Sequence, residues 1–319
     1  MLYSQSQVLL LFFLYGFLGW VWEVLLVSIE RRHWVNRGFL YGPVLPIYGF
    51  GAFIIQWLTS PVQDNPLLVF LIGMAGVTLL EYVTGVVMDH LFHVRYWDYS
   101  SHRFNIKGHI SLIVSLGWGV LAVLLVNVLH PPIDSLLKLI PAAVAEPLSL
   151  ILTILFVVDV TKSVQAALDV KELLARLTES NERFAALVDQ FNGLSARAGQ
   201  SKEAIQTRLS LYGDSIKQKH EERPGAIELL RQRIDSVTQE IQSQIEQSAS
   251  TWEQSRLSAV LSQLHDIKSE LTQFEIRQAA RRAKDYLAAL KLIRRNPTSV
   301  SQHFKEALDE IKSHINNDK

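Results

Sequence analysis

Two glutamates interrupt the apolar runs in the first half of the sequence. Glu23 lies in the run from Val8 to Ile29, and Glu81 lies in the run from Leu67 to Met88. An ionisable group inside a membrane span is costly, so it marks either a functional site or a buried ion pair. At a helical rise of about 1.5 Å per residue, each carboxylate falls roughly 10 Å from the end of its run that precedes a basic loop. Both acids are therefore predicted at one depth, where they either bind a polar or cationic group or form internal salt bridges.

The segment from Arg37 to Gly51, RGFLYGPVLPIYGFG, follows the first of these runs. It holds four glycines and two prolines and shows no helix or strand pattern of its own. Irregular backbone at membrane depth is tolerated only against protein or a water-filled cavity. We therefore expect a re-entering wall of a polar site, with Arg37 turned toward Glu23.

A second polar concentration runs from Asp89 to His109. Its spacing of histidines and acids is too loose for a zinc motif, and its mixture of aromatic and cationic residues is typical of a segment at the lipid headgroups. We expect it to cap the same site. The predicted substrate-binding residues are Glu23, Arg37, Tyr41, Tyr48, Glu81, Trp97, Asp98, Arg103 and Asn105. No catalytic residue, metal or cofactor is predicted.

Five segments are apolar enough to cross a bilayer, although the second and fifth are short. They are Val8–Ile29, Val44–Leu58, Leu67–Met88, His109–Leu129 and Pro147–Lys162. Lys and Arg in short loops favour the cytoplasm. The loops after the first and third spans carry Arg31, Arg32, Arg37, Arg95, Arg103 and Lys107, whereas the opposite side has only Lys138. The prediction is an all-α polytopic membrane bundle with its N-terminus outside and its C-terminal part in the cytoplasm.

Charge divides the chain into two unlike halves. Residues 1–162 hold eight Lys/Arg and nine Asp/Glu, whereas residues 163–319 hold twenty-three and twenty-two. We therefore predict a transmembrane bundle over 1–162 and a cytoplasmic helical domain over 163–319. The near-balanced charge disfavours a nucleic-acid surface, which draws on excess Lys and Arg. The absence of cysteine excludes disulfides and thiolate chemistry.

The second half shows a heptad-like pattern of apolar residues. A first set runs from Val170 to Tyr212, and a second runs from Ile227 to Phe274 with a loss of phase around Gln242 to Arg256. Pro224 and Gly225 separate the two sets, and Asn296 and Pro297 are expected to end the helix of the second set. A short amphipathic helix with Phe304, Leu308, Ile311 and Ile315 follows. A helical hairpin, a coiled coil with a second copy or another partner, or both, fit this pattern equally.

Four motifs together resemble a known family of bacterial multi-pass membrane proteins. They are YGFLGWVWEV, VNRGFLYGPVLPIYGFG, LEYVTG and HLFHVRYWDYSSHRFNIKGHISL, and they occur in the expected order between about Tyr15 and Pro131. The family is the putative ABC-transporter type IV group, so the resemblance implies a permease component in the inner, cytoplasmic membrane of a bacterial cell. The sequence has no Walker-type phosphate loop, so ATP-driven action would need a separate ATPase subunit.

Three functions remain open from the sequence. The first is a permease-like membrane protein with a polar site in the cytoplasmic leaflet, and it would act with membrane lipid around it and with an oligomeric or ATPase partner. The second is a membrane-embedded enzyme acting on lipid headgroups, which would need a base such as His93, His102 or Asp98. The third is a scaffold or sensor that recruits partners through residues 163–319. We favour the first, and with it a role other than catalysis.

Overall fold

The computed structural model describes residues 3–197, 223–248, 250–281 and 284–317. These residues are almost entirely helical, as predicted, with one small β-hairpin. They form two compact units, which are taken separately below. The first unit comprises residues 1–173 together with 287–319, and the second comprises 174–286. These bounds differ from the predicted domains, because the predicted boundary at 162 lies inside an unbroken helix and because the last helices group with the apolar half.

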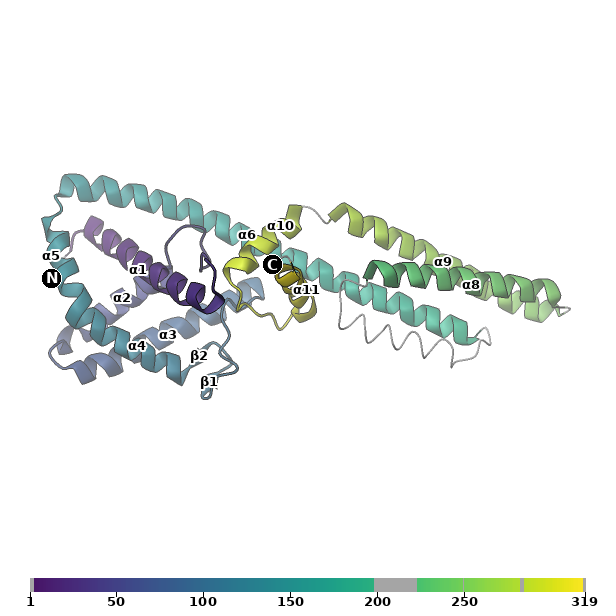
Figure 1. Cartoon of the computed structure of the whole chain (residues 1–319), viewed down its shortest axis with the longest axis horizontal. Helices are drawn as coiled ribbons and strands as arrows, with labels where there is room; N and C mark the ends of the chain where they lie inside the picture. The colour runs from purple at the N-terminus through teal and green to yellow at the C-terminus, as the bar shows by residue number, and fades with distance from the viewer. Residues whose placement is uncertain (1–2, 198–222, 249, 282–283, 318–319) are drawn as a thin grey trace. The chain divides into compact units, whose positions relative to one another are not determined.

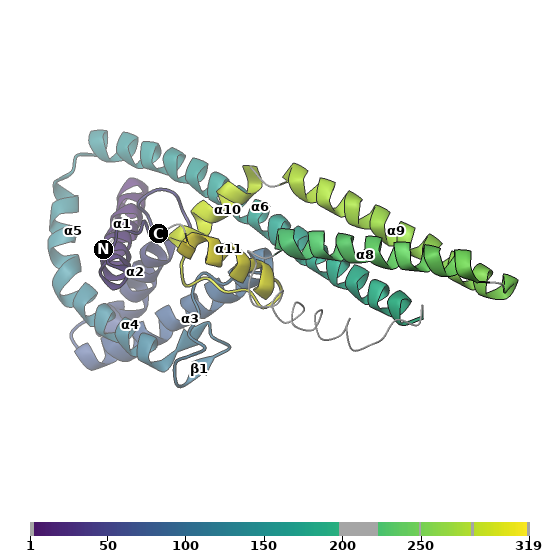
Figure 2. The ribbon, with the colours of Figure 1, turned by 45° about the vertical axis from the view of Figure 1, so that its right-hand side comes forward.

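Helices α1 (Gln5–Arg31), α2 (Pro46–Thr59), α3 (Pro66–Phe92) and α4 (Leu112–Leu124) form the bundle of the first unit. Each packs against its neighbour in sequence, as Figures 1 and 2 show. Ser4 caps the start of α1 by accepting a hydrogen bond from the backbone N–H of Gln7. The loops 32–45 and 93–111 lie where α1 and α3 end, and we call this the basic end of the bundle.

Helix α2 begins part of the way along α1 rather than at its end. The N–H of Leu45, the residue before α2, donates to the carbonyl of Gly16 in the middle of α1 at 3.0 Å. Arg31 lies about 22 Å further along α1, at about 1.5 Å per residue. The segment after α1 therefore returns into the bundle before α2 starts, which accounts for its glycines and prolines.

Among the residues that the structure describes, four helical segments are long and apolar enough to cross a membrane. They are Gln5–Arg31, Pro66–Phe92, Leu112–Leu139 and the start of Ala142–Leu194. The third joins α4, a π-helical turn η2 (Leu125–Leu129) and α5 (His130–Leu139), and the fourth belongs to α6 (Ala142–Arg197). The second predicted span corresponds to α2, whose 14 residues are too few for the same criterion. The count of five spans is therefore not confirmed, whereas an apolar helical bundle is.

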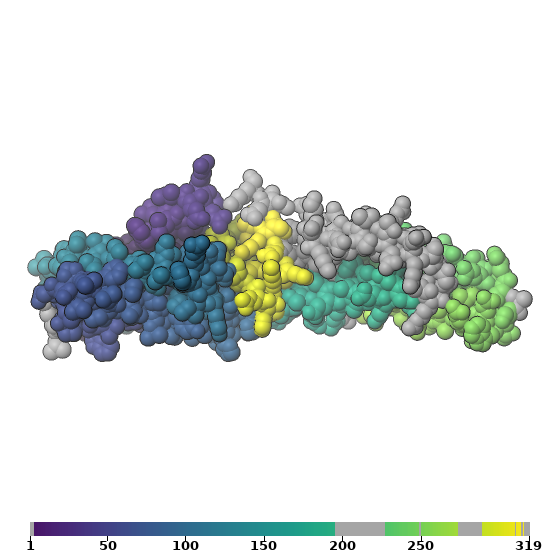
Figure 3. All heavy atoms as spheres, turned by 90° about the horizontal axis from the view of Figure 1, so that it is seen from below, coloured from purple at the N-terminus to yellow at the C-terminus, as the bar shows by residue number. Residues whose placement is uncertain are grey.

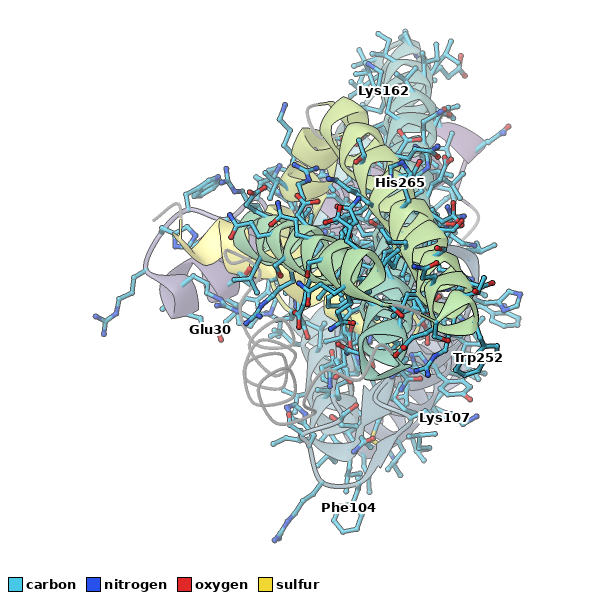
Figure 4. All side chains as sticks on the ribbon, turned by 90° about the vertical axis from the view of Figure 1, so that its right-hand side faces the viewer. Glu30, Phe104, Lys107, Lys162, Trp252 and His265 are labelled. Atoms are coloured by element: carbon cyan, nitrogen blue, oxygen red, sulfur yellow. The ribbon has the colours of Figure 1, made fainter. Side chains whose placement is uncertain are left out.

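The remaining short elements complete the loops of the bundle. The 3₁₀ turn η1 (Ser60–Val62) links α2 to α3. Strands β1 (Asn105–Ile106) and β2 (Ile110–Ser111) pair antiparallel in the loop after α3. At the tip of this loop the Phe104 ring is 79% exposed and points outward (Figure 4), in agreement with an interfacial position.

The C-terminal helices α10 (Lys284–Arg295) and α11 (Lys305–Asn317) frame a docked segment at the basic end of the bundle. Val300 and Arg95 exchange backbone hydrogen bonds of 2.8 and 2.9 Å as an isolated antiparallel bridge. Figure 3 shows the yellow C-terminal residues beside the blue loop that follows α3. Leu308 and Ile311 of α11 are fully buried, which confirms the predicted amphipathic helix.

The second unit packs the end of α6 with α8 (Arg223–Gln247) and α9 (Thr251–Arg281). Its core contains the predicted heptad residues Phe184, Leu187, Phe191, Leu194, Ile227, Leu230, Ile234, Val237, Ile241, Leu257, Val260, Leu264, Ile267 and Leu271. The turn between α8 and α9 falls inside the stretch where the pattern loses phase. The predicted positions Ala198, Ile205 and Tyr212 lie outside the described residues, and a coiled coil with a second chain stays a prediction.

Candidate functional site

Glu23 of α1 contacts a tyrosine of α2 and an arginine of the re-entering segment. The hydroxyl of Tyr48, in the first turn of α2, donates to Glu23 Oε1 at 2.8 Å. The guanidinium of Arg37 approaches from the loop, with its Nε 3.8 Å from Glu23 Oε2. The side chains of Arg37 and Glu23 are 12% and 29% exposed, so the pair is only partly open.

A glycine in α1 makes this arrangement fit. A Cβ added to Gly19 would lie 2.2 Å from the Tyr48 ring atom Cγ, closer than any stable contact. Any side chain at this position would therefore displace the ring that holds Glu23. The structure assigns Gly19 a role in positioning Tyr48, beyond the close helix contact expected of small residues in membrane helices.

Glu81 in α3 is more deeply enclosed, at 3% exposed. Its two carboxylate oxygens accept hydrogen bonds from the Tyr99 hydroxyl at 3.1 Å and from the indole N–H of Trp118 at 3.0 Å. Burial raises the pKa of Tyr99, so this hydroxyl keeps its proton and remains a donor. The rings of Tyr48 and Trp118 meet edge to face at 5.4 Å, and they connect the two glutamates through one aromatic layer.

Arg37 also binds the C-terminal segment. Its Nη1 donates to the side-chain oxygen of Asn296 at 3.4 Å, and its Nη2 donates to the hydroxyl of Thr298 at 3.2 Å and to the carbonyl of Tyr96 at 3.3 Å. The Asn296 amide also donates to the carbonyl of Gly38 at 3.1 Å. One guanidinium, with its fan of fixed donors, thus joins the acid of α1 to residues near the end of the chain.

The re-entering segment is held from the other side by α6. Asp159 accepts the backbone N–H groups of Tyr41 and Gly42 at 2.9 and 2.8 Å, one on each carboxylate oxygen. Asp159 therefore caps two backbone donors of the re-entering segment. The Tyr41 ring lies beneath the guanidinium of Arg295, whose carbon is 4.0 Å from the ring centre. Tyr41, a predicted site residue, therefore contacts Asp159 and Arg295 rather than either glutamate.

The loop after α3 is braced mainly by its own polar groups. The indole N–H of Trp97 donates to the carbonyl of His109 at 2.9 Å, Asp98 accepts from the backbone N–H and hydroxyl of Ser100, and Asn105 accepts from the N–H of Gly108. Arg103 is exposed. The structure therefore brings together Glu23, Arg37, Tyr48 and Glu81 among the predicted site residues, and it gives Trp97, Asp98 and Asn105 contacts that shape the loop.

A charged cluster fixes this loop to the end of α3. Arg95 Nε lies 2.7 Å from Asp89 Oδ2, and the ring Nε2 of His109 lies 3.8 Å from the same oxygen. Burial and the neighbouring Arg95 lower the pKa of His109, which favours the neutral imidazole. Gly85 leaves space for this ring, because an added Cβ would lie 3.0 Å from its Nδ1. No group of three or more metal-ligating side chains occurs within the described ranges.

Sequence reasoning missed several residues of the cluster. Trp118 lies in an apolar run without an ionisable signal, although a buried indole N–H needs an acceptor and could have been matched to Glu81. Tyr99 belongs to a quoted motif but was not assigned to the site. Asn296 and Thr298 lie more than 250 residues from Arg37. The sequence marks Asn296 only as part of a helix end and gives no signal at Thr298.

A large apolar cavity borders the re-entering segment. It has a volume of about 1390 Å³ and is lined by α1, α5, α6 and residues 41–44. Most of its wall is aliphatic or aromatic, and polar groups gather at one end at Asp159, Lys162, Gln165 and Asp169. A cavity that is apolar over most of its wall and polar at one end suits an amphiphilic ligand.

As a set, the two glutamates, one guanidinium and their aromatic donors can hold or release a polar group without a covalent step. Both acids accept hydrogen bonds that fix their orientation, and the only cation that the structure places against Glu23 within the described residues is Arg37. Movement of Arg37 would leave the Glu23 carboxylate open to another cation.

Comparison with known proteins bears on the membrane half. The model of a family described as putative ABC-transporter type IV matches residues 10–164 and confirms the resemblance carried by the four motifs. No curated protein matches the chain. No solved structure matches it either.

Proposed function

We propose that the chain is the membrane component of a transport system with a polar site in the cytoplasmic leaflet. The match of residues 10–164 to the putative ABC-transporter type IV family supports this proposal. The site comprises Glu23, Arg37, Tyr48, Glu81, Tyr99 and Trp118. The basic end of the bundle faces the cytoplasm of a bacterial cell, in agreement with its excess of Arg and Lys.

The observation that carries this proposal is the dual contact of Arg37. Its guanidinium faces Glu23 on one side and Asn296 and Thr298 on the other. A displacement of the C-terminal segment would move Arg37 and change the charge balance around Glu23. A partner that pulls on this segment could thereby open or close the site, which is how a separate ATPase would act on a chain without a phosphate loop of its own.

The re-entering segment and the apolar cavity fit the same role. Broken helices at membrane depth recur in transporters, where they surround the substrate path. Residues 41–44 form both the end of the re-entering segment and part of the cavity wall. A lipid in the cavity would therefore contact the segment that positions Arg37, and membrane lipid is a partner under this proposal.

The test is the isolation of the intact assembly. The full chain would be purified from its native membrane after mild cross-linking, and ATP hydrolysis would be measured for the wild type, Arg37→Gln and the matched control Arg32→Gln. We expect an ATPase subunit to co-purify, with hydrolysis that changes in Arg37→Gln and not in the control. A cross-linked preparation without any nucleotide-hydrolysing subunit would contradict the proposal.

The same preparation distinguishes the two other functions. An enzyme acting on headgroups would convert a labelled phospholipid in detergent and lose this activity in His102→Gln. A scaffold would keep its partners in Glu23→Gln and Glu81→Gln but lose them when residues 163–319 are removed. Either result without an ATPase would replace the transport proposal.

A further inference from the structure

A second pocket lies at the basic end of the bundle, apart from the glutamates. It has a volume of about 440 Å³ and is formed by the end of α1 and the residues that follow it, together with α10, Pro297 and α11. Five of its lining side chains are cationic or can become so, and no acid is among the described residues that line it. The residues that define this basic pocket chemically are Arg31, His33, Trp34, Arg294, Arg295 and Lys312.

Arg295 is a buried cation whose hydrogen-bond donors are only partly satisfied. It is 9% exposed, and its Nη1 donates to the carbonyl of Leu40 at 2.7 Å. Its Nε and Nη2 are buried and have no hydrogen-bond partner among the described residues. A buried donor without an acceptor is unfavourable, and more so when it is charged. An anion bound beside Arg295 would supply the missing acceptor.

Lys312 contributes a second partly buried cation. Its ammonium donates to the carbonyl of Ser299, which uses one of its donors and orients the side chain. Burial lowers the pKa of both Lys312 and Arg295, and nearby Arg31 adds to the effect on Lys312. Asp309 is the acid that counters this charge on Lys312. Like charges gathered in a hollow favour a multiply charged anion.

The pocket lies where a membrane surface would be. Arg31 is in the last turn of α1, which is one of the four membrane-crossing candidates. Ile29 and Trp34 are 74% and 68% exposed on either side of it. An exposed tryptophan beside basic residues is typical of the headgroup level, where basic pockets bind anionic lipids.

We propose that this basic pocket binds a phosphate group, supplied by the headgroup of an anionic lipid or by a free phosphate compound. The ligand would be held by Arg31, Lys312 and Arg295, with Trp34 against the apolar boundary. Such a ligand would connect Lys312 of α11 and Arg295 of α10 to Arg31 at the end of α1. The site is separate from the glutamate cluster, so its test does not depend on the transport proposal.

The test uses the purified full chain in a neutral detergent. It would be titrated separately with short-chain phosphatidylglycerol, short-chain phosphatidylcholine and inorganic phosphate, with bound molecules counted by native mass spectrometry and the midpoint of thermal unfolding followed in parallel. We expect phosphatidylglycerol to bind more tightly than phosphatidylcholine and to raise the midpoint. Inorganic phosphate that competes with it would identify the phosphate alone as sufficient, whereas a lack of competition would identify the lipid headgroup.

The variants locate the binding. Arg31→Gln and Lys312→Gln should each weaken phosphatidylglycerol binding about five-fold, as expected for one charge near a membrane surface. Lys305→Gln, an exposed charge on the same helix α11 outside the pocket, should leave it unchanged. If Lys312→Gln fails to fold, Arg31→Gln alone decides, because that side chain is exposed. Absence of binding to the wild type, or equal binding by Arg31→Gln, would overturn the proposal.

Discussion

The guanidinium of Arg37 lies 3.8 Å from the carboxylate of Glu23 and at the same time hydrogen-bonds Asn296, 259 residues later in the sequence. A residue in the re-entering segment thus connects an acid of the first membrane helix to the end of the chain. The C-terminal segment is held to the bundle by further contacts, including the bridge between Arg95 and Val300. A change at the polar site is therefore expected to affect the C-terminal segment as well, and the reverse.

Gly19→Ala should destabilise the bundle by about 1–3 kcal/mol, because the added Cβ would overlap the Tyr48 ring and force it away from Glu23. The measurement is the free energy of unfolding in mixed detergent micelles. Gly117→Ala is the matched control, since an added Cβ there meets nothing within 4 Å and alanine is the better helix former. Equal effects of the two substitutions would contradict the positioning role of Gly19.

Asp159→Asn should loosen the re-entering segment. The asparagine oxygen can still accept from one of the two backbone N–H groups of Tyr41 and Gly42, but its amide N–H₂ would face the other donor. We expect a loss of about 1–3 kcal/mol in unfolding free energy and faster hydrogen exchange at residues 41 and 42. Glu146→Gln, an exposed acid on the same helix, is the control. Unchanged exchange at both amides would contradict the capping role.

Stability should fall as the pH drops below about 6.5, in part because of His109. Its pKa in the folded protein is lower than its ordinary value of 6.5, chiefly because of burial. The unfolded chain therefore binds more protons than the folded one below that value, and protonation favours unfolding. The stability is fully present above about 6.5 and declines as the pH falls toward the lowered pKa. Thermal unfolding between pH 5 and 8 should show a weaker decline in His109→Gln, and parallel curves would exclude this histidine as a cause.

The sequence was informative wherever local chemistry decides the structure. The apolar runs became helices, the heptad residues of the second unit became its core, and Arg37 turned toward Glu23 because a basic side chain and an acid at membrane depth have few other partners. The Asn296–Pro297 pair ended α10 as expected, since proline cannot continue a helix.

Contacts between distant parts of the chain could not be predicted in the same way. The docking of residues near Asn296 depends on backbone carbonyls at Gly38 and Tyr96, which leave no mark on the pattern of side chains. The length of α2 likewise depends on where the loop meets Gly16, a backbone contact without a sequence signal. Trp118 could not be assigned to the site from the sequence, because the only polar group of its side chain is one indole N–H in an otherwise apolar run.

The most direct test of the account is hydrogen exchange at the Val300 amide, which donates to the Arg95 carbonyl. Glu23 makes no contact of its own with the C-terminal segment among the interactions described above, so it can influence Val300 only through Arg37. In Glu23→Gln, compared with the exposed control Glu30→Gln, the account predicts faster exchange at Val300, because Arg37 loses its charged partner and its hold on Asn296 and Thr298 weakens. Exchange at Val300 that is the same in wild type and Glu23→Gln would contradict the link between the polar site and the C-terminal segment.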